Sequence, residues 1–135
     1  MIEKIVLRLL SLKSYSTYEL RKKLIRKGFN PQDIEPILEK YQRLGFLNDS
    51  DLTQRRIEGY KNRGYGPHWI AGKLKQQGLK LSAYTAEEQK EIIRRLLKTP
   101  IFARKDRNKQ IAALQRRGFD LNIIFQVVPF QETDF

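Results

Sequence analysis

The stretch STYELRKKLIRKGF, residues 16–29, contains a short helical pattern that returns twice along the chain. The end of each copy is an apolar frame that closes on glycine: Leu24-x-x-x-Gly28-Phe29, Leu74-x-x-x-Gly78-Leu79 and Leu114-x-x-x-Gly118-Phe119. Glycine readily takes the left-handed conformation of a helix C-cap, and the apolar residue after it can fold back onto the helix. Three copies, at spacings of 50 and 40 residues, predict an internal repeat.

The start of the repeated helix and its charges give two further observations. Ser16 and Glu19 have the spacing of a capping box, which marks the start of the first copy. The charges do not recur, because Lys23 corresponds to Lys73 but then to Ala113. The repeat therefore encodes the fold, and the binding chemistry has to be argued from other residues.

The helical patterns divide the chain into three modules. Residues 1–47 are predicted to form three helices, the first over 2–12, the second over 17–27 and the third ending at Gly45. Residues 48–84 carry helices over about 51–63 and 67–77, but only about one turn fits between Gly78 and Thr85, so this module is truncated. Residues 85–130 begin with a second capping box, which opens a helix that Pro100 closes. A basic helix over roughly 101–117, which Asp106 could divide, and a short helix before Pro129 follow. Residues 131–135 are expected to be a frayed tail.

One helix start is ambiguous. Asn30 and Pro31 have the pattern of a cap and first helical residue, but Pro36 would then lack an internal hydrogen bond. With Asp33 as the cap instead, Pro36 falls in the first turn, where a missing N–H matters little. Neither alternative involves a strand. Alternating apolar runs are absent throughout, and the sequence predicts an all-α fold.

The net charge is +12, from 27 basic and 15 acidic residues. The three modules contribute +5, +4 and +3, so the excess is spread along the chain. Such a charge implies an acidic partner, with a solvated, soluble surface as the alternative.

There is no cysteine, which excludes disulfides and thiolate chemistry. No run is long enough to span a bilayer, and no large amphipathic face with exposed aromatic residues favours a membrane.

The candidate binding residues are basic side chains on the expected helices, of which we expect no more than about half to touch a partner. They are Lys22, Lys23, Arg26, Lys27, Arg55, Arg56, Lys61, Arg63, Lys73, Arg104, Lys105, Arg107, Lys109, Arg116 and Arg117.

Aromatic residues in and beside the expected turn at residues 64–67 are a second candidate for a binding site. Tyr65 and Trp69 could form an exposed recognition tip with His68, although a tryptophan next to Ile70 is more often part of a core. His68 has no second metal-ligand type near it, and no Ser-His-acid arrangement is present. We therefore expect no metal, no cofactor and no enzymatic activity.

Several segments, in the order in which they occur, resemble the RecX family of bacterial recombination regulators. They are Ser16-x-x-Glu19-Leu20-x-x-Lys23-Leu24-x-x-Lys27-Gly28-Phe29, Gly45-Phe46-Leu47-Asn48-Asp49, Gly64-Tyr65-Gly66-Pro67-x-x-Ile70, Leu74-x-x-x-Gly78 and Arg107-x-Lys109-x-x-x-x-Leu114-x-Arg116-Arg117-Gly118-Phe119. The resemblance covers about residues 1–128.

The resemblance implies an elongated, curved tandem array of three-helix, helix-turn-helix-like modules, here with about eight helices. It implies a cytoplasmic, monomeric and non-enzymatic negative regulator that binds in the groove of the RecA–DNA filament and suppresses ATP hydrolysis, strand exchange and the SOS response. Single- or double-stranded DNA would be contacted through its backbone. One departure is Lys73, where the family often has an acidic residue.

The alternative is a free-standing DNA-binding protein with basic helix-turn-helix-like units. A recognition helix should then carry side chains that reach base edges. The expected exposed faces carry mostly lysine and arginine, which favours contacts to a backbone or filament.

Overall fold

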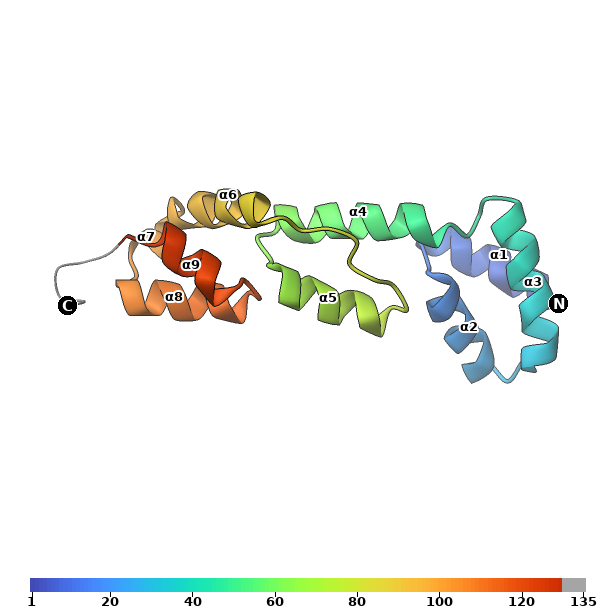
Figure 1. Ribbon diagram of the computed structural model, residues 1–135. Coiled ribbons are helices and arrows are strands. Elements are labelled where there is room, and N and C mark those ends of the chain that lie inside the picture. Colours follow the sequence, from blue (N-terminus) through green and yellow to red (C-terminus); the bar gives the residue numbers. More distant parts are fainter. Residues whose placement is uncertain (130–135) are drawn as a thin grey trace. The chain divides into compact units, whose positions relative to one another are not determined.

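The computed structural model describes residues 1–129, and this part of the chain is helical, with no strand (Figure 1). The all-α prediction is confirmed. The helices are α1 (Ile2–Leu12), α2 (Thr17–Arg26), α3 (Pro31–Arg43), α4 (Asp49–Asn62), α5 (Pro67–Gln76), α6 (Ala86–Leu97), α7 (Pro100–Ala103), α8 (Arg107–Arg116) and α9 (Leu121–Val127). No helix within residues 1–129 combines the length and apolar character that crossing a membrane requires. The expected frayed tail, residues 131–135, lies outside the described residues.

Nine helices stand in the described range where about eight were expected, and α7 accounts for the difference. The basic helix expected over roughly 101–117 is divided at Asp106, whose side chain accepts a hydrogen bond from the Lys109 amide and so begins α8. Between α5 and α6, residues 79–85 contain no helix, so the truncation of the middle three-helix repeat is confirmed.

The start of α3 follows the first of the two alternatives. Asn30 is the N-cap and Pro31 the first helical residue, which leaves Pro36 inside the helix. Pro36 has no N–H to donate to the carbonyl of Gln32. Gln32 is exposed, so water can satisfy that carbonyl.

The three repeated turns share one hydrogen-bond pattern. The amides of Phe29, Leu79 and Phe119 donate to the carbonyls of Leu24, Leu74 and Leu114 at 3.2, 2.8 and 3.3 Å. This is the six-to-one bond of a Schellman motif, and Gly28, Gly78 and Gly118 between them have φ angles of 97°, 73° and 93°. The internal repeat predicted from the sequence is therefore a repeated helix end.

The described chain forms two compact units. Unit 1 comprises residues 1–56 with 74–80, and unit 2 comprises residues 57–73 and those from 81 onward. Helices α1, α2 and α3 enclose the core of unit 1 around Val6, Leu20, Leu24 and Ile34, all fully buried (Figure 1). The module boundaries at 47/48 and 84/85 stay predictions.

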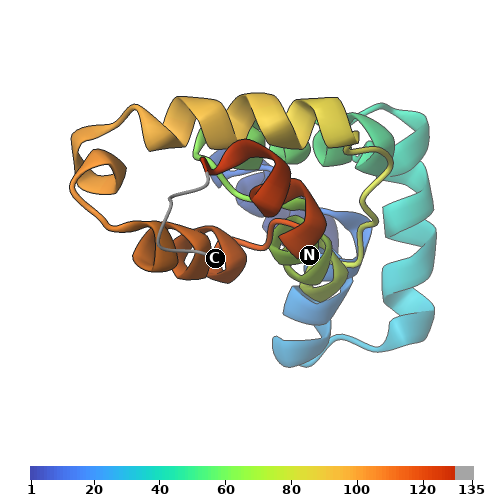
Figure 2. The same ribbon diagram turned by 60° about the vertical axis from the view of Figure 1, so that its left-hand side comes forward.

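In unit 2, α9 lies between α6 and α8 (Figure 2). Its core contains Ile93, Leu114 and Ile124, which are fully buried, and Phe102 of the short α7. The role of α7 is thus to place one aromatic side chain in this core.

Each unit contains a close contact between two repeats. In unit 1 the Ser16 hydroxyl donates to the Gln77 carbonyl at 2.6 Å, and a Cβ added at Gly78 would lie 2.3 Å from the Cβ of Tyr18. In unit 2 the amide of Gly66 donates to the Arg117 carbonyl at 2.7 Å, and a Cβ at Gly118 would lie 2.3 Å from the backbone nitrogen of Trp69. Only glycine permits this approach.

Candidate functional site

The first candidate site is a pocket of about 260 Å³, lined by several cations, at the start of α2 in unit 1. We call it the lysine–tyrosine site. Its lining includes Lys13, Tyr15, Tyr18, Lys22, Lys23 and Arg26. Its geometry follows from the capping box: the Ser16 hydroxyl accepts from the Glu19 amide and the Glu19 carboxylate accepts from the Ser16 amide. This fixes the start of α2, so that Tyr18 and Lys22 lie one turn apart on one face.

Lysine ammonium groups lie over both tyrosine rings. Lys13 Nζ is 4.8 Å from the Tyr15 ring centre and Lys22 Nζ is 5.1 Å from the Tyr18 ring centre. Tyr15 is buried, whereas Tyr18 is 40% exposed, so part of the Tyr18 side chain is accessible. Cations with an exposed aromatic ring suit a single-stranded nucleic acid, because phosphates pair with the cations and bases stack on rings. Tyr15, Tyr18 and Lys13 were not among the candidates from the sequence, although their position around the capping box was a usable signal.

The single acidic residue that lines this site, Glu19, is held by Arg56. Both carboxylate oxygens of Glu19 accept hydrogen bonds from Arg56, at 2.9 and 3.2 Å. Burial by itself raises the pKa of Glu19, but the hydrogen bonds from Arg56 and from the Ser16 backbone outweigh it, and the pKa is lowered. Glu19 therefore stays charged near neutral pH, and its charge is matched by Arg56.

Two of the candidate cations are engaged inside the fold. Arg56 also donates to Gln77 Oε1 at 2.8 Å and to the Ser14 carbonyl at 3.1 Å, within unit 1. Lys61, in unit 2, is buried and pairs with Glu88, and its hydrogen bond is the largest cause that lowers the pKa of Glu88. We leave both residues out of the proposed binding surface, because their charges already have partners.

Tyr65 and Trp69 stack on each other, with ring centres 3.7 Å apart and an angle of 11° between the rings. Arg63 and Arg117 flank Tyr65, with guanidinium carbons 5.8 and 5.5 Å from its ring centre. Arg117 also donates to the carbonyls of Arg63 and Gly64. Both aromatic side chains are half-buried, so this group is a packed and partly exposed cluster.

His68 pairs with Asp120. A hydrogen bond from the Gln89 side chain is the main cause that lowers the pKa of Asp120, and His68 adds to it. Within residues 1–129, no group of three metal-ligating side chains comes together.

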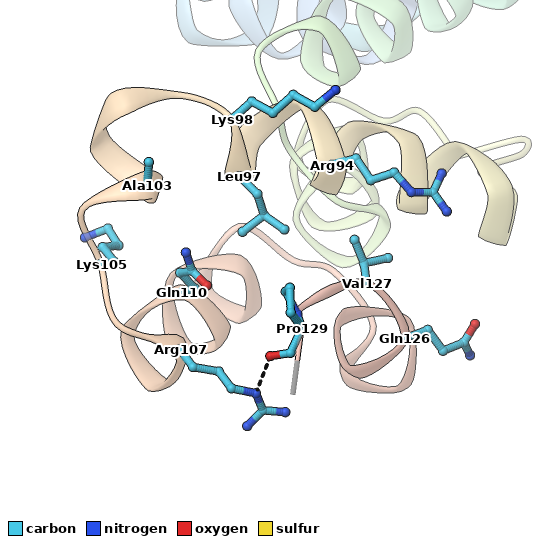
Figure 3. Close-up of a pocket in the computed structure, with 10 residues that line it drawn as sticks. All are labelled: Arg94, Leu97, Lys98, Ala103, Lys105, Arg107, Gln110, Gln126, Val127 and Pro129. Carbon is cyan, nitrogen blue, oxygen red and sulfur yellow. Dashed lines mark hydrogen bonds between the residues drawn. The ribbon is translucent and has the colours of Figure 1, made fainter. Parts of the chain in front are cut away.

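The second candidate site is a pocket of about 670 Å³ in unit 2, which we call the basic pocket (Figure 3). It lies among α6, α7, α8 and α9. Its lining is Arg94, Leu97, Lys98, Ala103, Lys105, Arg107, Gln110, Gln126, Val127 and Pro129. Lys105 and Arg107 were among the candidates from the sequence, whereas Arg94 and Lys98 were not. Their spacing of four residues on a helix was a signal that these two cations share a face.

The remaining candidate cations are dispersed. Arg55 forms an exposed pair with Asp51 at 3.0 Å. The structure exposes five others, which do not line either site: Lys27, Lys73, Arg104, Lys109 and Arg116.

Comparison with known proteins matches two parts of the chain to domains of the same family. Residues 4–40 match the model of the first three-helix domain of RecX, and residues 87–128 match that of the third three-helix domain.

Relatives and a solved structure agree with these matches. "Regulatory protein RecX" of Legionella pneumophila strain Corby is 33% identical over 132 residues, which cover 90% of this chain and 88% of the relative. The protein of the same name from Vibrio cholerae is 28% identical over 139 residues, with 95% and 91% covered. The crystal structure of RecX from Lactobacillus salivarius superposes with a TM-score of 0.80 at 22% identity, over 93% of this chain and 90% of that one. This structural match shows a shared fold.

Proposed function

The chain belongs to the RecX family of regulatory proteins, and we propose that it is a negative regulator of the RecA recombinase that binds in the groove of the RecA–DNA filament. In this role it inhibits ATP hydrolysis and strand exchange, and through them the SOS response. The observation that carries the proposal is the relationship to regulatory proteins over 90% of the chain.

The lysine–tyrosine site supports binding to the DNA of such a filament. The lysine–tyrosine site has the chemistry for a DNA strand, with cations for phosphates and an exposed ring at Tyr18 for a base. Other exposed cations, such as Lys27 and Arg116, add charge without a shaped site. Several weak contacts on one chain raise the overall affinity, because each contact after the first is intramolecular. We propose that the protein works as a cytoplasmic monomer and without catalysis of its own.

The test is ATP hydrolysis by RecA on single-stranded DNA, with the protein added after filaments have formed. We expect inhibition at concentrations well below those that coat the free DNA. A double charge reversal in the lysine–tyrosine site, Lys22→Glu with Lys23→Glu, should weaken the inhibition by roughly tenfold or more, because phosphate contacts become repulsive.

The matched control is Lys4→Glu with Arg8→Glu on α1, which changes the net charge equally at exposed positions outside the site. Equal loss in both variants would mean that total charge, and not this site, drives binding. The alternative function, a free-standing DNA-binding protein, predicts no inhibition of hydrolysis together with tight binding to naked DNA. Such binding should weaken with salt, with a slope of about −0.7 to −0.9 per neutralised phosphate.

A further inference from the structure

A set of three side chains recurs between the first and second repeats, although the charges as a whole do not recur in all three. The set comprises a basic residue, a tyrosine two positions later and a lysine eight positions after the tyrosine. It is Lys13, Tyr15 and Lys23 in unit 1, and Arg63, Tyr65 and Lys73 in unit 2. The third repeat has Ala103, Lys105 and Ala113 at these positions and lacks the set. All four cations of the set are exposed, so packing of the core does not account for their recurrence.

In unit 2 these cations border the stacked rings of Tyr65 and Trp69. The Arg63 guanidinium carbon is 5.8 Å from the ring centre of Tyr65, and Lys73 Nζ is 5.9 Å from that of Trp69. Lys23 of unit 1 has the same relation to its tyrosine, with its ammonium 5.9 Å from the ring centre. The recurrence in the sequence is therefore also a recurrence of cations beside aromatic rings. We call Arg63, Tyr65, Trp69 and Lys73 the tyrosine–tryptophan site.

The two cations of this site have no acidic partner in the described part of the chain. Within residues 1–129, neither Arg63 nor Lys73 forms an ion pair with a carboxylate. Trp69 occupies the position that Glu19 has in the first repeat, so a ring stands where the lysine–tyrosine site has its acidic residue. A cation beside an aromatic ring keeps its charge, so Arg63 and Lys73 are both able to pair with an anion.

Hydrogen bonds hold the turn that carries Tyr65. Its amide donates to the Tyr60 carbonyl at 3.1 Å, and its carbonyl accepts from the Tyr84 hydroxyl at 2.8 Å. Arg117 donates to the Arg63 carbonyl at 3.1 Å and lies 5.5 Å from the Tyr65 ring centre, so it is a positioning residue for this turn. Because the stack is ordered in the free protein, binding does not have to order it first, which favours affinity.

Cations beside partly exposed rings fit a single-stranded nucleic acid better than an acidic peptide or a duplex. The bases of a single strand can stack on Tyr65 or Trp69, both half-buried, while its phosphates pair with the cations. Carboxylates of a peptide would use the cations and leave the rings unused, and a duplex keeps its bases stacked on one another. A strand also repeats a base and a phosphate at each nucleotide, which suits a site that recurs in two repeats.

We propose that the tyrosine–tryptophan site binds a single-stranded nucleic acid, in addition to the lysine–tyrosine site of unit 1. A base extends the stack of Tyr65 and Trp69, and neighbouring phosphates pair with Arg63 and Lys73. This inference deepens the proposed function and rests on it for the source of the strand, the DNA of a filament. The binding itself is measured without RecA, so its failure would not decide whether the protein inhibits RecA.

The experiment uses the full chain and the fluorescence of Trp69, the only tryptophan in the sequence. Hexathymidylate is titrated in at low ionic strength, and an abasic strand of the same length and charge is titrated in parallel. We expect saturable quenching by hexathymidylate. The abasic strand should need a concentration roughly tenfold higher or more for the same quenching, because it has no base to stack.

Variants test the two cations. Arg63→Ala with Lys73→Ala should raise the midpoint of quenching by roughly tenfold, because two phosphate contacts are lost. The matched control is Lys4→Ala with Arg8→Ala, which removes the same charge at exposed positions outside the site and should leave the midpoint within about twofold. Equal shifts in both variants would contradict the role of Arg63 and Lys73.

Three other results would overturn the proposal. One is quenching by the abasic strand at the same concentrations as by hexathymidylate, which would show that no base stacks here. Another is loss of the quenching in the Lys22→Glu, Lys23→Glu variant, which would assign the signal to the lysine–tyrosine site. The third is quenching by hexaglutamate at lower concentrations than by hexathymidylate, which would assign the site to an acidic protein. If the Arg63→Ala, Lys73→Ala variant does not fold, the comparison of the two strands on the unchanged protein still decides.

Discussion

In unit 1 a side chain makes the polar contact between two repeats, whereas in unit 2 the backbone makes it. The Ser16 hydroxyl donates to the Gln77 carbonyl in the first case, and the Gly66 amide donates to the Arg117 carbonyl in the second. Ser16 and Gly66 are equivalent positions of the repeat, and each carbonyl belongs to the residue before a repeated glycine. The repeat therefore fixes where two backbones meet, while the group that forms the bond can change.

The same contrast holds for the surfaces. Unit 1 has cations around two tyrosine rings, whereas the lining of the basic pocket in unit 2 includes cations and the aliphatic residues Leu97 and Val127. Both surfaces are built on the same apolar frame, with Leu24 and Leu114 fully buried. A binding site can thus differ between units without any change in the residues that form the repeat, which is why the charges do not recur with the apolar frame.

The largest expected effect comes from glycines at equivalent positions of the repeat. The backbone at Gly28 has a left-handed φ, but a new Cβ there would have no neighbour within 4 Å. Gly28→Ala should therefore lower the free energy of unfolding by about 1–2 kcal/mol. Gly118→Ala adds a clash with the Trp69 backbone and should cost about 2–5 kcal/mol. Urea denaturation measures both. Equal losses would show that the close approach to Trp69 contributes nothing.

The next effect compares the two capping boxes. Thr85→Ala removes a cap and should cost about 1 kcal/mol. Ser16→Ala removes an equivalent cap and also leaves the Gln77 carbonyl without its donor, for a total of about 2–4 kcal/mol. Ser16→Thr should recover part of the loss, because it keeps a hydroxyl. If Ser16→Ala and Thr85→Ala lose the same free energy, the contact between repeats in unit 1 does not stabilise the fold.

Adjacent arginines provide a third test. Arg56→Ala leaves Glu19 charged and partly buried without its main partner, which should cost about 1–3 kcal/mol. Arg55→Ala removes an ion pair whose two side chains are 60% and 62% exposed, and should cost less than about 0.5 kcal/mol. Thermal unfolding of the two variants measures the difference. A larger loss for Arg55→Ala would reverse our assignment of Arg56 to the interior of unit 1.

The sequence predicted what depends on local spacing. The glycine turns, the two capping boxes and the division of a helix at Asp106 each involve residues within six positions of one another, so a pattern could reveal them. It did not separate binding cations from structural ones. Arg56 meets Glu19 across 37 residues and Lys61 meets Glu88 across 27, and no local pattern contains such pairs. The sequence did not indicate that Arg94 and Lys98 line the basic pocket, because their helix was recognised by its apolar side.

The smallest expected effect is on the acid sensitivity of the two units. The folded-state pKa values of Glu19 and Asp120 are both lowered, so each carboxylate contributes stability above its unfolded pKa that is lost as the pH falls through the folded one. Glu19→Gln should therefore lower stability at neutral pH and flatten its fall on acidification. Asp120→Asn should flatten it less, because Asp120 is 41% exposed and Glu19 only 22%. Unfolding midpoints from neutral pH to about pH 3 measure both slopes. A larger flattening for Asp120→Asn than for Glu19→Gln would reverse the order that we derive from burial.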